Sequence, residues 1–138
     1  MIDIIAGSKG KGKTKVLLDR VNEDIKKVDG SIVFIDKNNG HMYELNNQVR
    51  LIVSPDFGID STDKFIGFIA GILSQDSDLQ KIYLDGFLKT AFIKGNLDYA
   101  IEELDKLSKK FDVDFVVSLS ADASTTSEYV KKFITTAL

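Results

Sequence analysis

Three glycines, three lysines, a serine and a threonine lie together between Gly7 and Thr14, in a segment that reads Gly-Ser-Lys-Gly-Lys-Gly-Lys-Thr. A loop that wraps around a phosphate group must turn several backbone N–H groups inward, and glycine adopts the required backbone angles without strain. The lysines add positive charge beside the anion. The segment therefore predicts a loop that binds phosphate groups.

The spacing of this segment fits the P-loop pattern G-x-x-x-x-G-K-[ST] at every fixed position. A short apolar run precedes it and a helical pattern follows, so the positive end of a helix dipole would face the phosphate. We expect Lys13 to reach the β- and γ-phosphates of a nucleoside triphosphate and Thr14 to ligate Mg²⁺. The alternative is a glycine-rich turn with scattered lysines. The candidate phosphate-binding residues are Gly7, Ser8, Lys9, Gly10, Lys11, Gly12, Lys13, Thr14 and Lys15.

A second motif is the hydrophobic run Ile82-Tyr83-Leu84-Asp85, which ends in a carboxylate. This is the Walker B pattern, in which an aspartate at the carboxyl edge of a strand holds Mg²⁺ through a water molecule. We therefore take Thr14 and Asp85 as the candidate metal residues. The alternative is that Asp85 forms a turn with Gly86.

Asp36 also ends a buried apolar run, Ser-Ile-Val-Phe-Ile-Asp. The candidate catalytic residues are Lys13 and Asp36. Asp36 could act as a base or position water near the γ-phosphate, and the alternative is that it is a turn carboxylate. Ser118 and Ser120 bracket the end of the last predicted strand; in RecA-like proteins, which the two motifs resemble, a polar residue at this place can sense the γ-phosphate, and the alternative is a strand end with solvated serines. His41, the single histidine, is interpreted as a surface residue beside a turn.

Short apolar runs alternate with helical patterns along the chain, which is typical of a mostly parallel sheet with helices on both faces. We predict one three-layer α/β domain over residues 1–138, with the ligand at the carboxyl ends of the strands. Asn39-Gly40 favours a tight hairpin, so we expect residues 41–45 to form an antiparallel edge strand. A final helix is predicted over residues 127–135. The expected core strands are Ile2–Ala6, Ser31–Asp36, Val49–Ser54, Lys81–Asp85 and Phe115–Leu119.

The composition fits a globular domain of 138 residues, with 43% hydrophobic residues and a net charge of -3. This balance lacks the basic excess of nucleic-acid-binding proteins, so we expect no nucleic-acid partner. The chain has no cysteine, which excludes disulfides and thiolate-bound zinc. Its longest apolar stretch, residues 65–73, is far shorter than the ~20 residues that span a bilayer. We expect a cytoplasmic protein with no membrane segment.

The P-loop and Walker B segments resemble those of the P-loop NTPase superfamily, and the predicted layout covers nearly the whole chain. Its length is similar to that of small RecA-like bacterial ATP-binding proteins labelled as relatives of the twitching-motility retraction ATPase. The resemblance implies ATP and Mg²⁺ as ligands. Many RecA-like ATPases carry a catalytic Glu directly after the Walker B Asp, but here Gly86 and Phe87 follow. No N/T-K-x-D segment for guanine is present.

We therefore expect an Mg-ATP-binding protein with slow or partner-stimulated hydrolysis, acting as a switch or assembly factor. An unidentified protein partner, or a second copy in a homo-oligomer, would complete the site. One alternative is a small-molecule kinase, although the chain has only two arginines, Arg20 and Arg50. The other is a non-catalytic module that binds phosphate or nucleotide.

Overall fold

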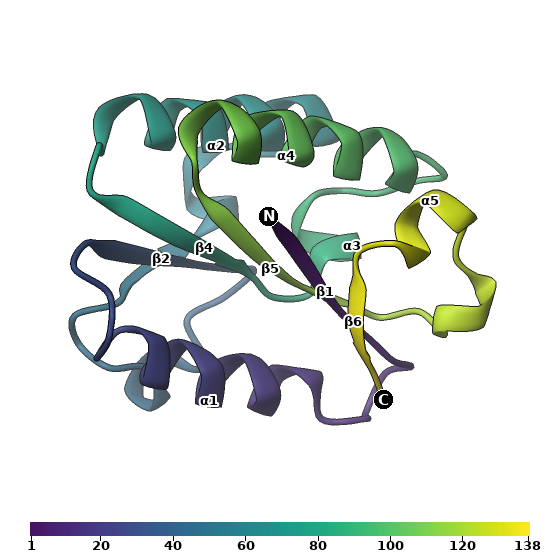
Figure 1. Ribbon diagram of the computed structural model, residues 1–138, viewed down its shortest axis with the longest axis horizontal. Helices are drawn as coiled ribbons and strands as arrows, with labels where there is room; N and C mark the ends of the chain where they lie inside the picture. The colour runs from purple at the N-terminus through teal and green to yellow at the C-terminus, as the bar shows by residue number, and fades with distance from the viewer.

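The computed structural model describes residues 1–138, which form a three-layer α/β fold (Figure 1). Six strands make up the central layer. Helices α2 and α4 cover one face of the sheet and helix α1 covers the other. In chain order, the strands and helices are β1 (Ile2–Ala6), α1 (Lys13–Asp24), β2 (Ser31–Asp36), β3 (Arg50–Val53), α2 (Thr62–Gln75), β4 (Leu79–Leu84), α3 (Phe87–Thr90), α4 (Leu97–Phe111), β5 (Asp114–Leu119), α5 (Glu128–Lys131) and β6 (Ile134–Ala137).

The sheet has the order β3-β2-β4-β5-β1-β6, and every neighbouring pair is parallel. All six strands therefore end at the same edge. The three-layer parallel architecture that the sequence predicts is confirmed. The strand β1, which leads into the glycine-rich loop, lies between β5 and β6, while β4 and β2 follow on the other side of β5.

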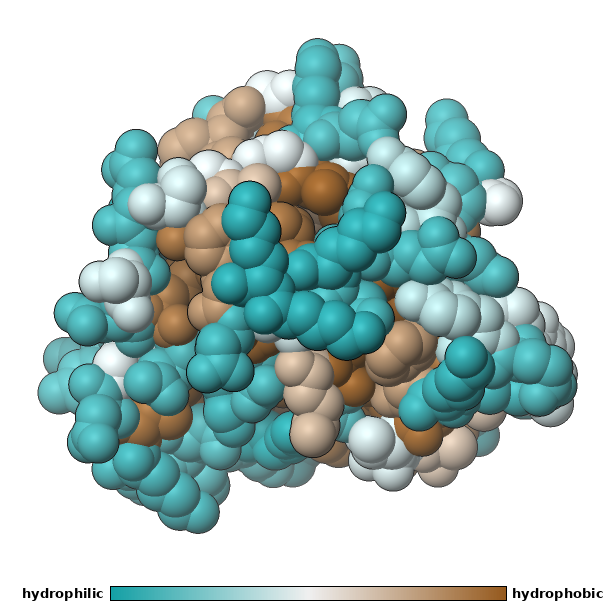
Figure 2. Space-filling view, turned by 45° about the horizontal axis from the view of Figure 1, so that its top comes forward, coloured by the Kyte–Doolittle hydropathy of each residue, from teal (hydrophilic) through white to brown (hydrophobic).

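The buried side chains of the strands form two separate cores, one on each face of the sheet, because successive side chains along a strand point to opposite faces. In β2, Val33 and Ile35 pack in the larger core with α2 and α4, whereas Phe34 packs with α1 in the smaller one. Strands that are buried on both faces read as continuous apolar runs. The outer surface over α2 and α4 is mixed, with hydrophobic atoms showing between hydrophilic side chains (Figure 2).

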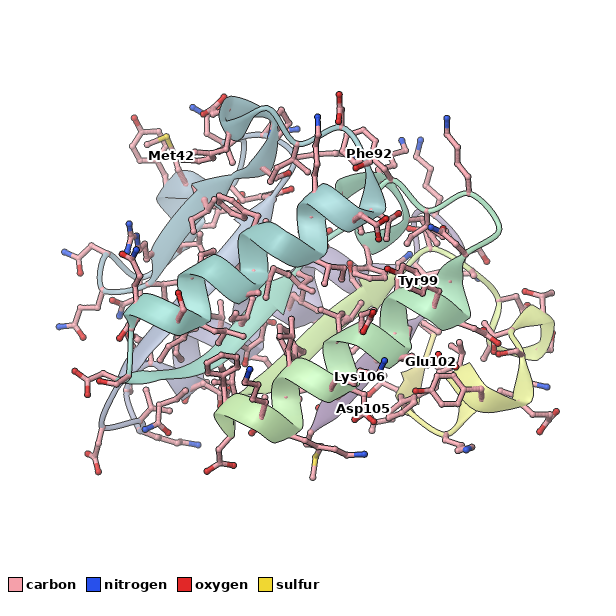
Figure 3. All side chains as sticks on the ribbon, turned by 90° about the horizontal axis from the view of Figure 1, so that it is seen from above. Met42, Phe92, Tyr99, Glu102, Asp105 and Lys106 are labelled. Atoms are coloured by element: carbon pink, nitrogen blue, oxygen red, sulfur yellow. The ribbon has the colours of Figure 1, made fainter.

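The antiparallel edge hairpin that we expected at Asn39-Gly40 is wrong. Residues Met42–Glu44 form a 3₁₀ turn, and the next strand, β3, runs parallel to β2. The Asn22 side chain on α1 donates to the Glu44 carbonyl at 2.8 Å and accepts from the Asn46 N–H at 2.8 Å, which holds this segment against the helix instead of the sheet edge. Figure 3 labels Met42 far across the molecule from Tyr99 of α4.

The final helix that we expected over residues 127–135 is also wrong in its second half. Helix α5 ends at Lys131, and residues Ile134–Ala137 form the edge strand β6 beside β1. Backbone hydrogen bonds of 2.8 Å join Ile4 to Phe133 and Leu138 to Ala6. The β-branched run Ile134-Thr135-Thr136 favours a strand once β1 offers a free edge. None of the helices has the length and apolar character that crossing a bilayer requires.

Candidate functional site

The glycine-rich loop joins the end of β1 to the start of α1, as the motif requires. Gly10 and Gly12 have φ angles of 87° and 89°, in the left-handed region that other residues rarely adopt. Gly12 is also the residue that precedes the first turn of α1. Gly7 meets a different constraint, because an added Cβ there would lie 3.1 Å from the Leu138 Cβ. The loop therefore depends on glycine for both backbone angles and space.

Lys13 is the first residue of α1, and its side chain folds back over the loop. The Nζ atom donates to the Ser8 carbonyl oxygen at 3.0 Å, and the residue is only 6% exposed. Burial lowers the pKa of Lys13 from its ordinary value, and the negative charge of Asp85 opposes this change. A buried ammonium whose partner is a single neutral carbonyl is poised to pair with an anion.

Asp85 lies just past the end of β4 and is the centre of a hydrogen-bond network. The Thr14 hydroxyl donates to Oδ2 at 3.0 Å, and the Ser118 hydroxyl donates to Oδ1 at 2.7 Å. Ser118 in turn accepts from the Gly86 N–H at 2.7 Å. The residues meet because β4, β5 and β1 are neighbours and end at one edge. The structure thus brings Thr14 and Asp85 together, and it places Ser118 as the partner of Asp85.

Asp36 ends β2, next to β4, and its carboxylate is buried with 3% exposure. Oδ1 accepts from the Lys37 N–H at 2.7 Å, whereas Oδ2 has no hydrogen-bond partner. Burial raises the pKa of Asp36 above its ordinary value; the Lys37 N–H opposes the rise and the charge of Asp85 adds to it. Asp36 therefore presents an unpaired acceptor beside Asp85.

His41 is a residue of this site that the sequence interpretation missed. One of its ring nitrogens and one oxygen each of Asp36 and Asp85 lie within 4.8 Å of one another. The Nδ1 atom is 3.0 Å from a carboxylate oxygen of Glu44. The only sequence signal was its position shortly after a strand that ends in aspartate, because the contact depends on the path of residues 37–45.

A cavity of about 540 Å³ lies over the carboxyl ends of the strands. This volume is in the usual range for a small-molecule or cofactor site. Only one of its fifteen lining residues, Leu88, is hydrophobic, so the cavity suits a highly polar ligand. The lining residues are Lys9, Gly10, Gly12, Lys13, Thr14, Asp36, Lys37, Asn38, His41, Asp85, Gly86, Leu88, Lys89, Ser118 and Ser120.

Two of the expected phosphate-binding lysines direct their side chains elsewhere. Lys15 is exposed on α1 and pairs with Asp19 at 3.2 Å, so only its backbone N–H belongs to the first turn of the helix. Lys11 is exposed and does not line the cavity. Two lysines that the sequence interpretation left out, Lys37 and Lys89, do line it. The exposed α4 residues labelled in Figure 3, such as Tyr99, lie outside the cavity.

No protein-family model matches the chain, and no curated protein matches it by sequence. Among solved structures, the fold is similar to that of a KaiC-like protein from the hyperthermophilic archaeon Pyrococcus horikoshii, with a TM-score of 0.67 and 13% sequence identity. The match covers 96% of this chain and 66% of the other, so this chain spans just under two thirds of that protein. The likeness shows that the chain has a RecA-like α/β fold.

Proposed function

We propose that this chain binds Mg-ATP over the Gly7–Thr14 loop and hydrolyses it slowly, or quickly only with a partner. The observation that carries the proposal is the contact of the Thr14 hydroxyl with the Asp85 carboxylate at 3.0 Å, beside the buried Lys13 ammonium. Lys13, Thr14 and Asp85 come from two segments far apart in the sequence and line one polar cavity, which supports a joint role in binding Mg²⁺ and phosphate. Glycine-rich loops at helix N-termini bind phosphate by the same physics.

The oxygen donors of Thr14 and Asp85 fit Mg²⁺, which prefers hard oxygen ligands. When bound, Mg²⁺ neutralises the charge of the phosphate oxygens. Lys13, which now bonds to the carbonyl of Ser8, would exchange that weak acceptor for a phosphate oxygen. Ser118 would hold the Asp85 carboxylate in orientation through its 2.7 Å hydrogen bond.

Asp36 is our candidate for the base that accepts a proton from the attacking water. The residue after Asp85 is Gly86, which has a positive φ of 61° and no side chain to serve as that base. Asp36 lines the same cavity, its Oδ2 has no hydrogen-bond partner, and its raised pKa moves toward the range in which a general base works. A single base without an arginine near the phosphates supports slow hydrolysis.

We further propose that a protein partner, or a second copy of this chain, supplies the missing cationic group. Neither arginine lines the cavity, and Arg20 is paired with Asp3. Such a requirement suits a nucleotide-dependent switch or assembly factor in the cytoplasm. The same absence of arginine weighs against a small-molecule kinase.

Titration calorimetry of Mg-ATP and Mg-GTP into the purified chain tests the proposal, followed by analysis of the nucleotide products. We expect saturable binding of Mg-ATP, weakened roughly 10- to 100-fold in Lys13→Ala, because a charged hydrogen bond contributes about 1.5–3 kcal/mol. Lys15→Ala is the matched control, since it removes the same charge two residues later, outside the cavity. If neither nucleotide binds, the chain is a non-catalytic module and the proposal is wrong.

A further inference from the structure

The residues Asp36, His41 and Asp85 form a cluster that Mg²⁺ does not explain. Each offers one ligand atom, and these atoms lie within 4.8 Å of one another. Two of the three are carboxylates buried to 3% and 6% exposure, and the third is an imidazole. Mg²⁺ takes oxygen ligands and keeps several waters, so a nitrogen donor at this position favours a different kind of cation.

We propose that this cluster is a binding site for a divalent transition-metal ion of the Zn²⁺ type. The free Oδ2 of Asp36 is an independent indication of a missing ligand, because a buried carboxylate oxygen without a partner is costly. Asp36 lines the cavity and lies close to a second buried carboxylate, Asp85. A bound cation would pair with both charges, and no side chain of the protein forms a hydrogen bond with Oδ2.

Glu44 completes the arrangement from outside the cluster. Its carboxylate oxygen is 3.0 Å from Nδ1 of His41, so Nδ1–H donates to Glu44 and the lone pair remains on Nε2. Metal-binding histidines almost always donate their other ring N–H to a carboxylate or carbonyl, which fixes the tautomer and raises the basicity of the ligand. The Glu44–His41 pair therefore prepares Nε2 for a metal.

The distances allow closure around one ion. Ligand atoms at the ~2.0–2.2 Å bond lengths of tetrahedral zinc lie roughly 3.4 Å apart, so the three atoms must approach by at most about 1.4 Å. His41 is partly exposed on a loop and can supply this movement, while Asp36 and Asp85 stay fixed at the strand ends. The remaining position would be open to water or a phosphate oxygen.

The site shares residues with the proposed nucleotide site but requires no nucleotide. If the proposed function also holds, a bound transition metal would occupy the Asp36 oxygen that serves as the base, and hydrolysis would fall. The metal would then regulate the same cavity in which ATP binds.

The test is titration of Zn²⁺ alone, and separately of Mg²⁺ alone, into the nucleotide-free chain by calorimetry. We expect one Zn²⁺ per chain, bound at least tenfold more tightly than Mg²⁺. Asp36→Asn and His41→Ala should each lose this binding, and Glu44→Gln should weaken it about 10- to 100-fold. The matched controls, Asp56→Asn and Glu23→Gln, change exposed carboxylates outside the cavity and should bind Zn²⁺ as the wild type does.

A spectroscopic readout is available because His41 is the only histidine and the chain has no cysteine. The ¹⁵N resonances of a single imidazole should report Zn²⁺ at Nε2, with Nδ1 still protonated. Circular dichroism shows whether each variant folds, and His41 is outside both cores. Equal Zn²⁺ affinity in His41→Ala and wild type, or no preference for Zn²⁺ over Mg²⁺, would overturn the inference. A wild-type chain that does not bind ATP would refute the proposed function but not the zinc site, because the Zn²⁺ titration contains no nucleotide.

Discussion

Replacing Asp36 with asparagine should stabilise the nucleotide-free chain while removing the ATP hydrolysis that we propose for it. The wild-type carboxylate is buried, faces Asp85 and leaves Oδ2 without a partner. Asparagine keeps the oxygen that accepts from the Lys37 N–H and replaces Oδ2 with an uncharged amide group. The change thus removes a buried negative charge that is repelled by Asp85.

An unsatisfied buried polar group costs about 1–3 kcal/mol of stability. For a chain of this length, 1 kcal/mol shifts the melting temperature by about 3–4 °C, so Asp36→Asn should melt roughly 3–12 °C higher than the wild type near neutral pH. Loss of a positioned general base lowers rates by about 10²- to 10⁴-fold, which sets the expected fall in ATP hydrolysis. Stability and activity are expected to change in opposite directions.

The gain should depend on pH in a defined direction. Burial raises the pKa of Asp36 in the folded chain, so folded molecules bind more protons than unfolded ones between the two pKa values. The contribution of Asp36 to stability is complete below the unfolded pKa and is lost as pH rises through the folded pKa. The difference between variant and wild type should therefore be small near pH 4 and grow toward pH 7.

Differential scanning calorimetry across this pH range, with a chelator and without nucleotide, measures the difference. Asp56→Asn is the control, because it makes the same change at an exposed residue after the neighbouring strand β3. A variant that melts at or below the wild type at pH 7, or a difference that does not change with pH, would refute the argument from burial.

Three further substitutions test stability away from the site. Gly30→Ala should lower the free energy of unfolding by about 1–3 kcal/mol, because its Cβ would lie 1.9 Å from the Asp78 carbonyl oxygen. Gly67→Ala, on helix α2, should raise the free energy of unfolding by about 0.5–1 kcal/mol, since a Cβ there meets nothing within 4 Å. Urea unfolding of both variants and the wild type measures the two changes. Tyr83→Phe should cost about 1.5–3 kcal/mol by removing a buried donor to Asp24. Burial of Asp24 tends to raise its pKa, but the hydrogen bond from Tyr83 helps to hold that pKa below its ordinary value. That stability is present above the unfolded pKa and lost in acid, so melts of wild type and variant should converge there.

The parallel core was predictable because its strands are continuous apolar runs followed by polar residues at one edge. The five residues of β2 from Ile32 to Asp36 are all buried, and so short an apolar run favours a strand over a helix. The edges were harder. A strand such as β6 is specified by the free edge of β1, more than 120 residues earlier, and its apolar residues fit a helical spacing equally well.

The candidate site divides in the same way. The loop that ends at Thr14 and the carboxylates Asp36 and Asp85 follow from local patterns, because the loop directly follows a predicted strand and each carboxylate is the last residue of one. The position of His41 could not be predicted from such patterns, because it depends on the path of the loop after β2, which the Asn22 side chain holds against α1 through hydrogen bonds to Glu44 and Asn46. The sequence left Ser118 as either a phosphate sensor or a solvated strand-end serine, and its contact with Asp85 depends on β4 and β5 being neighbours.

The place of β1 in the sheet has a consequence for the order of folding. β2, β3 and β4 follow one another in the chain, and β2 pairs with both of the others, so they can assemble early. β1 is made first but pairs only with β5 and β6, where Ile2 faces Phe115 and Ile4 faces Ile134. Closing such long loops is slow because the entropy is lost before any contact forms. We therefore expect the phosphate loop to be completed in the last stage of folding. A bound nucleotide should then slow unfolding, and nucleotide present during refolding should not speed the formation of the β2–β4 unit.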